Sequence, residues 1–229
     1  SLIVTGRKTL IELPLAILTK AQNGNFFMYY GFHDLNAKWT YKPDKRNSFH
    51  ANLYTGDDYI DYYLIPRHKN DDRSRYKNKW GNYLVSGKWS SVVSDRLFMS
   101  NTLSTTRYRL KTKNIYIPNG RDINSSVRYL YKSTINDLSL RSDWTYSHSS
   151  LLTIDFGMKL SHLHNVPNRI EHSETAMANA FALNSFEATA YQNSVVSITP
   201  DLKTELGLRL VNYFIKDYRL NKLEPRLSL

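Results

Sequence analysis

The segment Asp34-Leu35-Asn36-Ala37-Lys38-Trp39-Thr40-Tyr41-Lys42 decides the fold, because polar and apolar residues alternate through all nine positions. Chance gives such a run only about once in a few hundred windows. Successive side chains of an extended strand point to opposite faces. The segment therefore predicts a β-strand with one polar face and one apolar face, and the apolar face carries Trp39 and Tyr41.

The same period of two recurs along most of the chain. It is clear again at 137–146, 152–161 and 205–210, whereas the faces of 97–111 are not resolved by the pattern. Most of the predicted strands are longer than the usual five or six residues and long enough to cross a bilayer when tilted. The pattern predicts ten strands, near residues 1–8, 31–42, 47–60, 80–93, 97–111, 127–147, 150–163, 184–199, 203–215 and 222–229.

The predicted connections alternate between short and long. Short turns rich in Pro, Asp and Ser are expected at 43–46, 94–96, 147–149 and 200–202. Long connections are expected near 9–30, 61–79, 112–126, 164–183 and 216–221. Outer-membrane barrels have this layout, with short periplasmic turns and long extracellular loops.

Aromatic residues gather at the strand ends. A girdle at the periplasmic interface is predicted beside the short turns, where amphipathic rings sit between lipid and water; its members are Trp39, Tyr41, Phe49, Trp89, Trp144 and Tyr146. An upper girdle is predicted at the opposite strand ends from Tyr59, Tyr62, Tyr63, Tyr213 and Phe214.

The polar face of the predicted strands is strongly charged. Acids and bases are intermixed on it, as suits ion pairs that line a wide, hydrated lumen, whereas a small barrel fills its interior with apolar side chains. Its charged members are Asp34, Lys38, Lys88, Asp137, Arg141, Asp143, Asp155, Lys159, Glu187, Glu205, Arg209, Glu224 and Arg226. The predicted fold is all-β: an antiparallel up-and-down transmembrane β-barrel, of which 1–229 forms one partial domain with about ten strands.

Composition excludes several other classes of protein. No run of 18 apolar residues occurs among the 229, which excludes a transmembrane helix. There is no Cys, so disulfides and thiolate metal sites are excluded. The net charge is +11, but basic residues are interleaved with Asp and Asn, so no nucleic-acid partner is expected. Ser1 opens without a signal peptide, and Leu229 lies in an alternating segment, which favours a fragment.

Several segments carry a resemblance to a known family. They are Glu187-Ala188-Thr189-Ala190-Tyr191-Gln192-Asn193, Ile198-Thr199-Pro200-Asp201-Leu202, Leu206-Gly207-Leu208-Arg209-Leu210 and Leu223-Glu224-Pro225-Arg226-Leu227-Ser228-Leu229. In this order and spacing they resemble the mid-barrel strands of TonB-dependent receptors, especially those of Bacteroidetes. Leu2–Thr9 and Tyr30–Lys38 look like earlier strands of the same family.

This resemblance implies a 22-stranded barrel in the outer membrane of a Gram-negative bacterium, plugged by an N-terminal domain. The implied function is energised uptake of a siderophore, haem, cobalamin, peptide or glycan, with the TonB complex as partner. The plug, the TonB box and the closing strands are expected outside this sequence. Outer-membrane lipid and lipopolysaccharide are the other expected partners. A passive porin-like barrel and a soluble β-rich carbohydrate-binding module are the alternatives.

Two groups of residues are candidate ligand-binding sites. Arg67, His68, Lys69 and Arg73 lie in a predicted charged extracellular loop, which suits the steering of anionic ligands or contact with lipopolysaccharide phosphates.

The second group is His162, His164 and His172. The first two are two residues apart on one strand, so their rings share a face, and imidazoles bind transition metals or haem iron. A polar strand end entering a loop explains the same pattern, so the metal stays open. Gly-x-Ser-x-Gly, phosphate-binding and dinucleotide motifs do not occur, so neither an enzyme nor a cofactor is expected.

Overall fold

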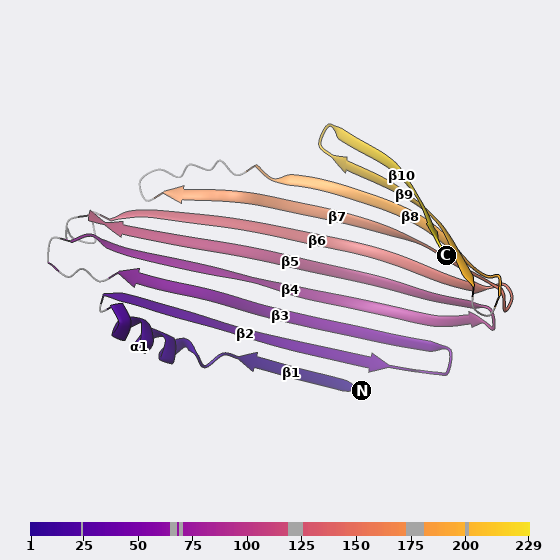
Figure 1. Ribbon diagram of the computed structural model, residues 1–229, viewed down its shortest axis with the longest axis horizontal. Helices are drawn as coiled ribbons and strands as arrows, with labels where there is room; N and C mark the ends of the chain where they lie inside the picture. The colour runs from indigo at the N-terminus through magenta and orange to yellow at the C-terminus, as the bar shows by residue number, and fades with distance from the viewer. Residues whose placement is uncertain (24, 65–67, 69–70, 119–125, 173–180, 200–201) are drawn as a thin grey trace.

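The structure is a computed structural model of residues 1–229, shown in Figure 1. It describes all of them except 24, 65–67, 69–70, 119–125, 173–180 and 200–201, and it describes the backbone but not the side chains of 23 and 168–172. Among the described residues, ten antiparallel strands form one sheet in which each strand pairs with the next along the chain. The predicted up-and-down all-β fold is confirmed.

All ten predicted strands are present, and several extend beyond their predicted ends. They are β1 (Leu2–Lys8), β2 (Phe26–Tyr41), β3 (Asn47–Leu64), β4 (Arg73–Ser94), β5 (Leu97–Ile117), β6 (Val127–Ser147), β7 (Leu152–His172), β8 (Leu183–Ser197), β9 (Lys203–Ile215) and β10 (Tyr218–Ser228). Much of the predicted loop 61–79 is therefore strand, because β3 continues to Leu64 and β4 begins at Arg73. We call the end with the β3–β4, β5–β6 and β7–β8 connections the upper end.

The register assigns every strand residue to one of two faces, because directly paired residues share a face. Leu53 pairs with Val85, and Leu103 pairs with Leu140. We call the face that carries these leucines and Val85 the outer face, and the opposite one the inner face. Large apolar side chains stand exposed on the lower half of the outer face; Leu103 is 55% exposed. Such a surface is expected of a barrel wall that faces lipid.

The polarity of both faces changes in the upper half of the sheet. On the outer face of β4, Val85 and Trp89 give way above Gly81 to charged residues. On the inner face of the same strand, Lys88 and Ser86 give way to aromatic rings such as Tyr76. The faces of β5 could not be read from the sequence because this strand carries apolar residues on one face below and on the other face above.

A row of stacked rings marks the lower end of the outer face. Trp39 stacks on Tyr41 with ring centroids 5.7 Å apart, Tyr41 on Phe49 at 6.4 Å, and Phe49 on Trp89 at 6.2 Å. Trp144 stacks on the Phe156 ring of the next strand at 6.2 Å. The rings of the predicted lower girdle thus share one face beside the short turns.

The predicted upper girdle is wrong as a single group. Tyr59, Tyr63 and Phe214 lie on the outer face, but Tyr62 and Tyr213 lie on the inner face. Tyr62 and Tyr63 are neighbours in a strand, so only one of the two side chains can face outward.

The chain also forms a helix that the strand pattern missed. Helix α1 (Glu12–Asn23) lies in the predicted long connection, beside the upper half of β2 and beyond the tip of the short strand β1. Its Thr19 hydroxyl accepts a hydrogen bond from the Met28 amide at 3.2 Å, at the edge of β2 that β1 leaves unpaired. No helix among the described residues is long and apolar enough to cross a membrane.

Side-chain hydrogen bonds define the lower turn between β2 and β3. The Asp44 carboxylate accepts hydrogen bonds from the Arg46 and Asn47 amides, both at 2.7 Å. The Asn47 side chain donates to the same carboxylate, and these bonds hold the pKa of Asp44 below its usual range.

The last upper connection differs from its prediction. β9 and β10 are joined by the two-residue turn Lys216-Asp217 instead of a long loop near 216–221. Lys216 has a φ of 48°, the left-handed conformation that tight two-residue hairpins require. The alternation of short and long connections therefore fails at this hairpin.

The two faces can be tested with neighbouring substitutions on β4. We expect Val85→Arg, in the middle of the apolar part of the outer face, to lower the free energy of unfolding in lipid vesicles by about 2–4 kcal/mol, the cost of arginine at mid-depth on a lipid-facing wall. Ser86→Arg places the same charge on the inner face and should change stability by less than about 1 kcal/mol. A urea titration of the full-length protein in vesicles measures both, and a larger loss for Ser86→Arg would contradict the face assignment.

Candidate functional site: a tyrosine platform on the inner face

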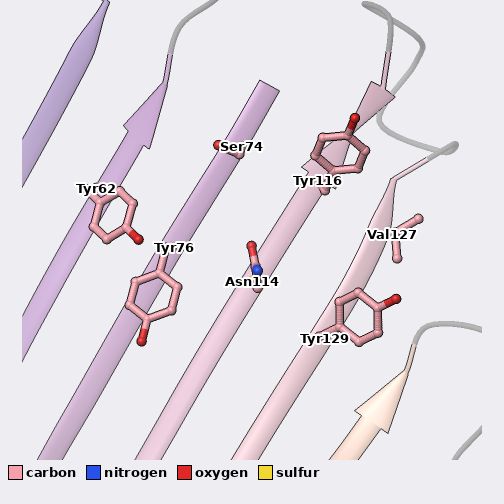
Figure 2. A pocket seen from close by; sticks show the side chains of 7 residues that line it. All are labelled: Tyr62, Ser74, Tyr76, Asn114, Tyr116, Val127 and Tyr129. Atoms are coloured by element: carbon pink, nitrogen blue, oxygen red, sulfur yellow. The ribbon is translucent and has the colours of Figure 1, made fainter. Parts of the chain in front are cut away.

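Two rows of paired residues on the inner face form a hollow at the upper end of the sheet. One row runs across four strands as Tyr62, Tyr76, Asn114 and Tyr129. The next row up continues it with Ser74, Tyr116 and Val127. Together these seven residues line a cavity of about 430 Å³, which we call the tyrosine platform (Figure 2).

The rings of the platform are held in place by their neighbours. Tyr62 stacks on Tyr76 with centroids 5.0 Å apart, and Phe26 lies 5.8 Å from Tyr62 on the other side. The Tyr116 hydroxyl donates a 2.6 Å hydrogen bond to Asp72, which precedes β4. Tyr129 stacks on Tyr131 at 6.5 Å and is 37% exposed.

The lining of this surface suits contact with ring-bearing molecules. None of the seven lining residues is charged at neutral pH, and four of them are tyrosines that offer a flat apolar face and a hydroxyl. Ser74 and Asn114 add hydrogen-bonding groups between the rings. A few polar groups among aromatic side chains are the usual composition of a small-molecule site.

The lower half of the inner face is charged, as the sequence predicted. Glu187 lies between Lys159 and Arg209, with nitrogen–oxygen distances of 3.9 and 4.0 Å, and Glu224 accepts from Lys222 at 2.8 Å. A hollow of about 880 Å³ lies beside these ion pairs, between β6 and β10. The inner face thus carries ion pairs below and aromatic rings above.

A second cluster of charges lies on the outer face above Gly81. Asp61 accepts two hydrogen bonds from the Arg75 guanidinium, at 2.9 and 2.6 Å, and its side chain is only 8% exposed. Asp57 contacts Arg109 at 2.9 Å and Lys79 at 3.3 Å. Asp57, Asp58 and Asp61 are close together in the sequence, and carboxylates at such spacing can bind Ca²⁺ when they converge. However, Asp58 points to the inner face, and cations from neighbouring strands neutralise the other two carboxylates.

The basic residues predicted as a ligand site do not join the tyrosine platform. Arg73 is the first residue of β4 and lies on the outer face, opposite Ile117. The exposed His68 donates its backbone N–H to Asp71 at 2.7 Å. Arg67 and Lys69 lie outside the described residues. A role for these four residues in ligand binding remains a prediction.

The histidine pair lies on the outer face of β7. The His162 ring stacks on Phe186 with centroids 4.5 Å apart, and His164 Nδ1 lies 2.7 Å from the Asn184 amide oxygen. Among the residues whose side chains are described, no group of three His, Cys, Asp or Glu side chains is placed to hold a metal ion. His172 is the last residue of β7, and its side chain lies outside that described part.

Sequence reasoning missed the platform because it treated each strand as having one apolar face throughout. A local signal was present on β4, where Tyr76 lies between Arg75 and Lys77, but Tyr62 is followed by another tyrosine. Only the register shows that the platform tyrosines line one hollow.

The strand order and the two faces define the chain as part of an up-and-down antiparallel β-barrel. No protein-family model and no curated protein matches the chain. Among solved structures it is similar to the ferric yersiniabactin uptake receptor FyuA from Yersinia pestis, at 11% identity and a TM-score of 0.49. That match covers 89% of this chain and 37% of FyuA, so the chain spans little more than a third of the length of FyuA.

Two further solved structures are more distant. The outer membrane protease OmpT from Escherichia coli is 11% identical, with a TM-score of 0.31, and the match covers 97% of this chain and 86% of that one. LpxR from Salmonella typhimurium is 8% identical, with a TM-score of 0.23, and the match covers 99% of both chains.

The outer charge cluster depends on the missing side chain of Gly81. Asp57, Gly81 and Arg109 are paired in one row, so the Arg109–Asp57 ion pair passes over the glycine. A Cβ atom on Gly81 would collide with the Asp57 carboxylate and with the Gly56 carbonyl oxygen. We expect Gly81→Ala to separate the ion pair and to lower the free energy of unfolding by about 1–3 kcal/mol in detergent.

Gly87→Ala is the matched control on the same strand and face. A Cβ atom there meets nothing within 4 Å, so this substitution should leave stability unchanged within about 0.5 kcal/mol. Chemical denaturation of both variants measures the difference. Equal stabilities of the two variants would contradict the proposed role of Gly81.

Proposed function

We propose that this chain is part of an outer-membrane receptor of the TonB-dependent type, which binds a scarce nutrient at its extracellular end for uptake. The argument for the membrane is the lower outer face, where exposed apolar side chains are bordered by stacked aromatic rings. The upper end, with its longer connections, then faces the outside of the cell.

The tyrosine platform is the observation that carries the receptor function. It lies on the inner face at the extracellular end, where a ligand entering from outside first meets the barrel wall. Uncharged rings with hydroxyl and amide groups between them suit a ligand with flat or pyranose rings. Among the nutrients that the resemblance implies, this favours the ring-bearing ones (an aryl siderophore, haem, cobalamin or a glycan) over a peptide.

Two features support a barrel larger than this sheet. β1 and β10 each pair on one side only in the described part of the chain, and lipid does not tolerate unpaired strand edges. Further strands are therefore expected to pair with both. The charged hollow on the lower inner face, which includes Arg141 and Arg226, offers a polar surface for a plug domain inside the barrel. Coupling to the TonB complex through that plug is proposed from the resemblance.

Uptake experiments distinguish this receptor from a passive porin. A strain that lacks the gene should lose growth on one of a panel of limiting nutrients: ferric siderophores, haem, cyanocobalamin, peptides and oligosaccharides. In the complemented strain, an uncoupler that collapses the inner-membrane proton gradient should abolish uptake of the labelled nutrient but leave its binding intact. Uptake that continues with the uncoupler would indicate a passive porin and contradict the proposal.

Substitution of a platform tyrosine tests where the nutrient binds. We expect Tyr76→Ala to raise the nutrient concentration for half-maximal binding about 5- to 30-fold, because a buried tyrosine contact commonly contributes about 1–2 kcal/mol. Tyr83→Ala, on the same strand but on the outer face, is the matched control and should bind normally. Equal effects of the two variants, or no effect of Tyr76→Ala, would rule out the platform as the site.

A further inference from the structure

The upper outer face carries basic side chains at four successive outward positions of β4, at four of β5, and at two positions of β6. The register brings them into one surface, which we call the cationic belt. Its members are Arg73, Arg75, Lys77, Lys79, Arg107, Arg109, Lys111, Lys113, Arg128 and Lys132.

The carboxylates of β3 that reach the belt neutralise only part of its charge. Asp57 and Asp61 are shared among Arg75, Lys77, Lys79 and Arg109, at nitrogen–oxygen distances between 2.6 and 3.4 Å. The exposed side chains Arg107, Lys111 and Lys113 have no salt bridge within the described part of the chain. The belt therefore keeps a strong positive charge along β5.

Two pairs of these cations lie directly opposite one another across β4 and β5. Lys77 is paired with Lys113, and Lys79 is paired with Lys111. Like charges in directly opposed positions destabilise a sheet. Lysines repeated in this arrangement are explained if an anion lies over them and neutralises the repulsion.

The belt lies at the height where lipid headgroups are expected. About ten residues separate Lys79 from Trp89 of the lower aromatic row on β4, which is roughly 33 Å along the strand. With a strand tilt of about 40°, this distance corresponds to about 25 Å along the membrane normal, the height of the apolar band of such barrels. The belt thus begins where the band ends.

An apolar hollow of about 330 Å³ adjoins the belt on the same face. It is lined by side chains of β5 to β9 that include Leu103, Leu138, Leu160 and Phe186. Leu103 precedes Arg107 by only two outward positions on β5. Cations therefore lie directly above an apolar depression in the lipid-facing wall.

We propose that the cationic belt binds the phosphate groups of lipopolysaccharide in the outer leaflet, with an acyl chain seated in the apolar hollow. Guanidinium and ammonium groups form strong charge-assisted hydrogen bonds with phosphate. A free phosphate, a nucleic acid or an anionic nutrient needs no apolar hollow beside its site, whereas a lipid with acyl chains fills one. The inference rests on the outer-membrane location given in the proposed function, but the belt faces away from the tyrosine platform, so it does not depend on nutrient uptake.

The experiment measures binding of fluorescent rough-type lipopolysaccharide to the full-length protein in an uncharged detergent. We expect the double variant Lys111→Gln, Lys113→Gln to bind it at least about tenfold more weakly. The double variant Lys38→Gln, Lys88→Gln removes the same charge from the inner face and should bind within about twofold of the wild type. Chemically dephosphorylated lipopolysaccharide should bind at least about tenfold more weakly to the wild type.

Thermal unfolding gives a second test, because the effect of Lys111→Gln on the unfolding temperature should change sign when lipopolysaccharide is added. Without lipopolysaccharide, Lys111→Gln should raise the unfolding temperature by about 1–3 °C, because it removes the repulsion between Lys111 and Lys79. With saturating lipopolysaccharide the same variant should unfold at a lower temperature than the wild type, because it loses a phosphate contact.

Three results would overturn the proposal. The first is equal weakening by the outer-face and inner-face double variants. The second is equal affinity for phosphorylated and dephosphorylated lipopolysaccharide. The third is competition by inorganic pyrophosphate at concentrations as low as those at which lipopolysaccharide binds, which would assign the belt to a free phosphate compound instead of a lipid.

Discussion

The structure depends on the need of every strand to pair its backbone N–H and C=O groups with a neighbouring strand. In lipid no water is present to satisfy these groups, so a membrane wall made of strands must be a continuous ladder. The pairing of β3 through β6 meets this condition over 18 to 21 paired positions between neighbouring strands, with one shift of register near the lower end, between Val92 and Ser94. In a paired strand, successive side chains point to opposite faces of the sheet. Alternate residues of each strand therefore face the lipid and the barrel interior.

The polarity of both faces changes at the same height, near Gly81. Below it, the outer face is apolar and the inner face carries Lys88 and other polar groups; above it, the outer face carries cations such as Lys79 and the inner face carries rings such as Tyr76. Both changes follow from one boundary, the upper limit of the hydrocarbon. Above that limit the outer face meets charged headgroups and water, and the inner face is free to present apolar rings to a ligand.

The sequence predicted the number of strands, their order and the lower aromatic row, because alternation at Trp39, Phe49 and Trp89 is a local pattern. It missed α1 because only alternation with a period of two was followed, whereas the pattern of a helix repeats every 3.6 residues. The sequence pattern did not predict the tyrosine platform or the cationic belt, for a different reason. Both are assembled across strands by the register, as in the pairing of Tyr76 with Asn114, and register is not a local property.

The most direct test of this account is a single-cysteine scan of residues 73–90 on β4 in the full-length protein, using spin labels in lipid vesicles. Residues 1–229 contain no cysteine, so within them each label reports one position. At 83, 85, 87 and 89 the label should collide with lipid-soluble oxygen and not with a water-soluble nickel chelate, whereas at 73, 75, 77 and 79, on the same face, the chelate should dominate. A pattern with the lipid-exposed positions at even residues, or without the change above Gly81, would contradict it.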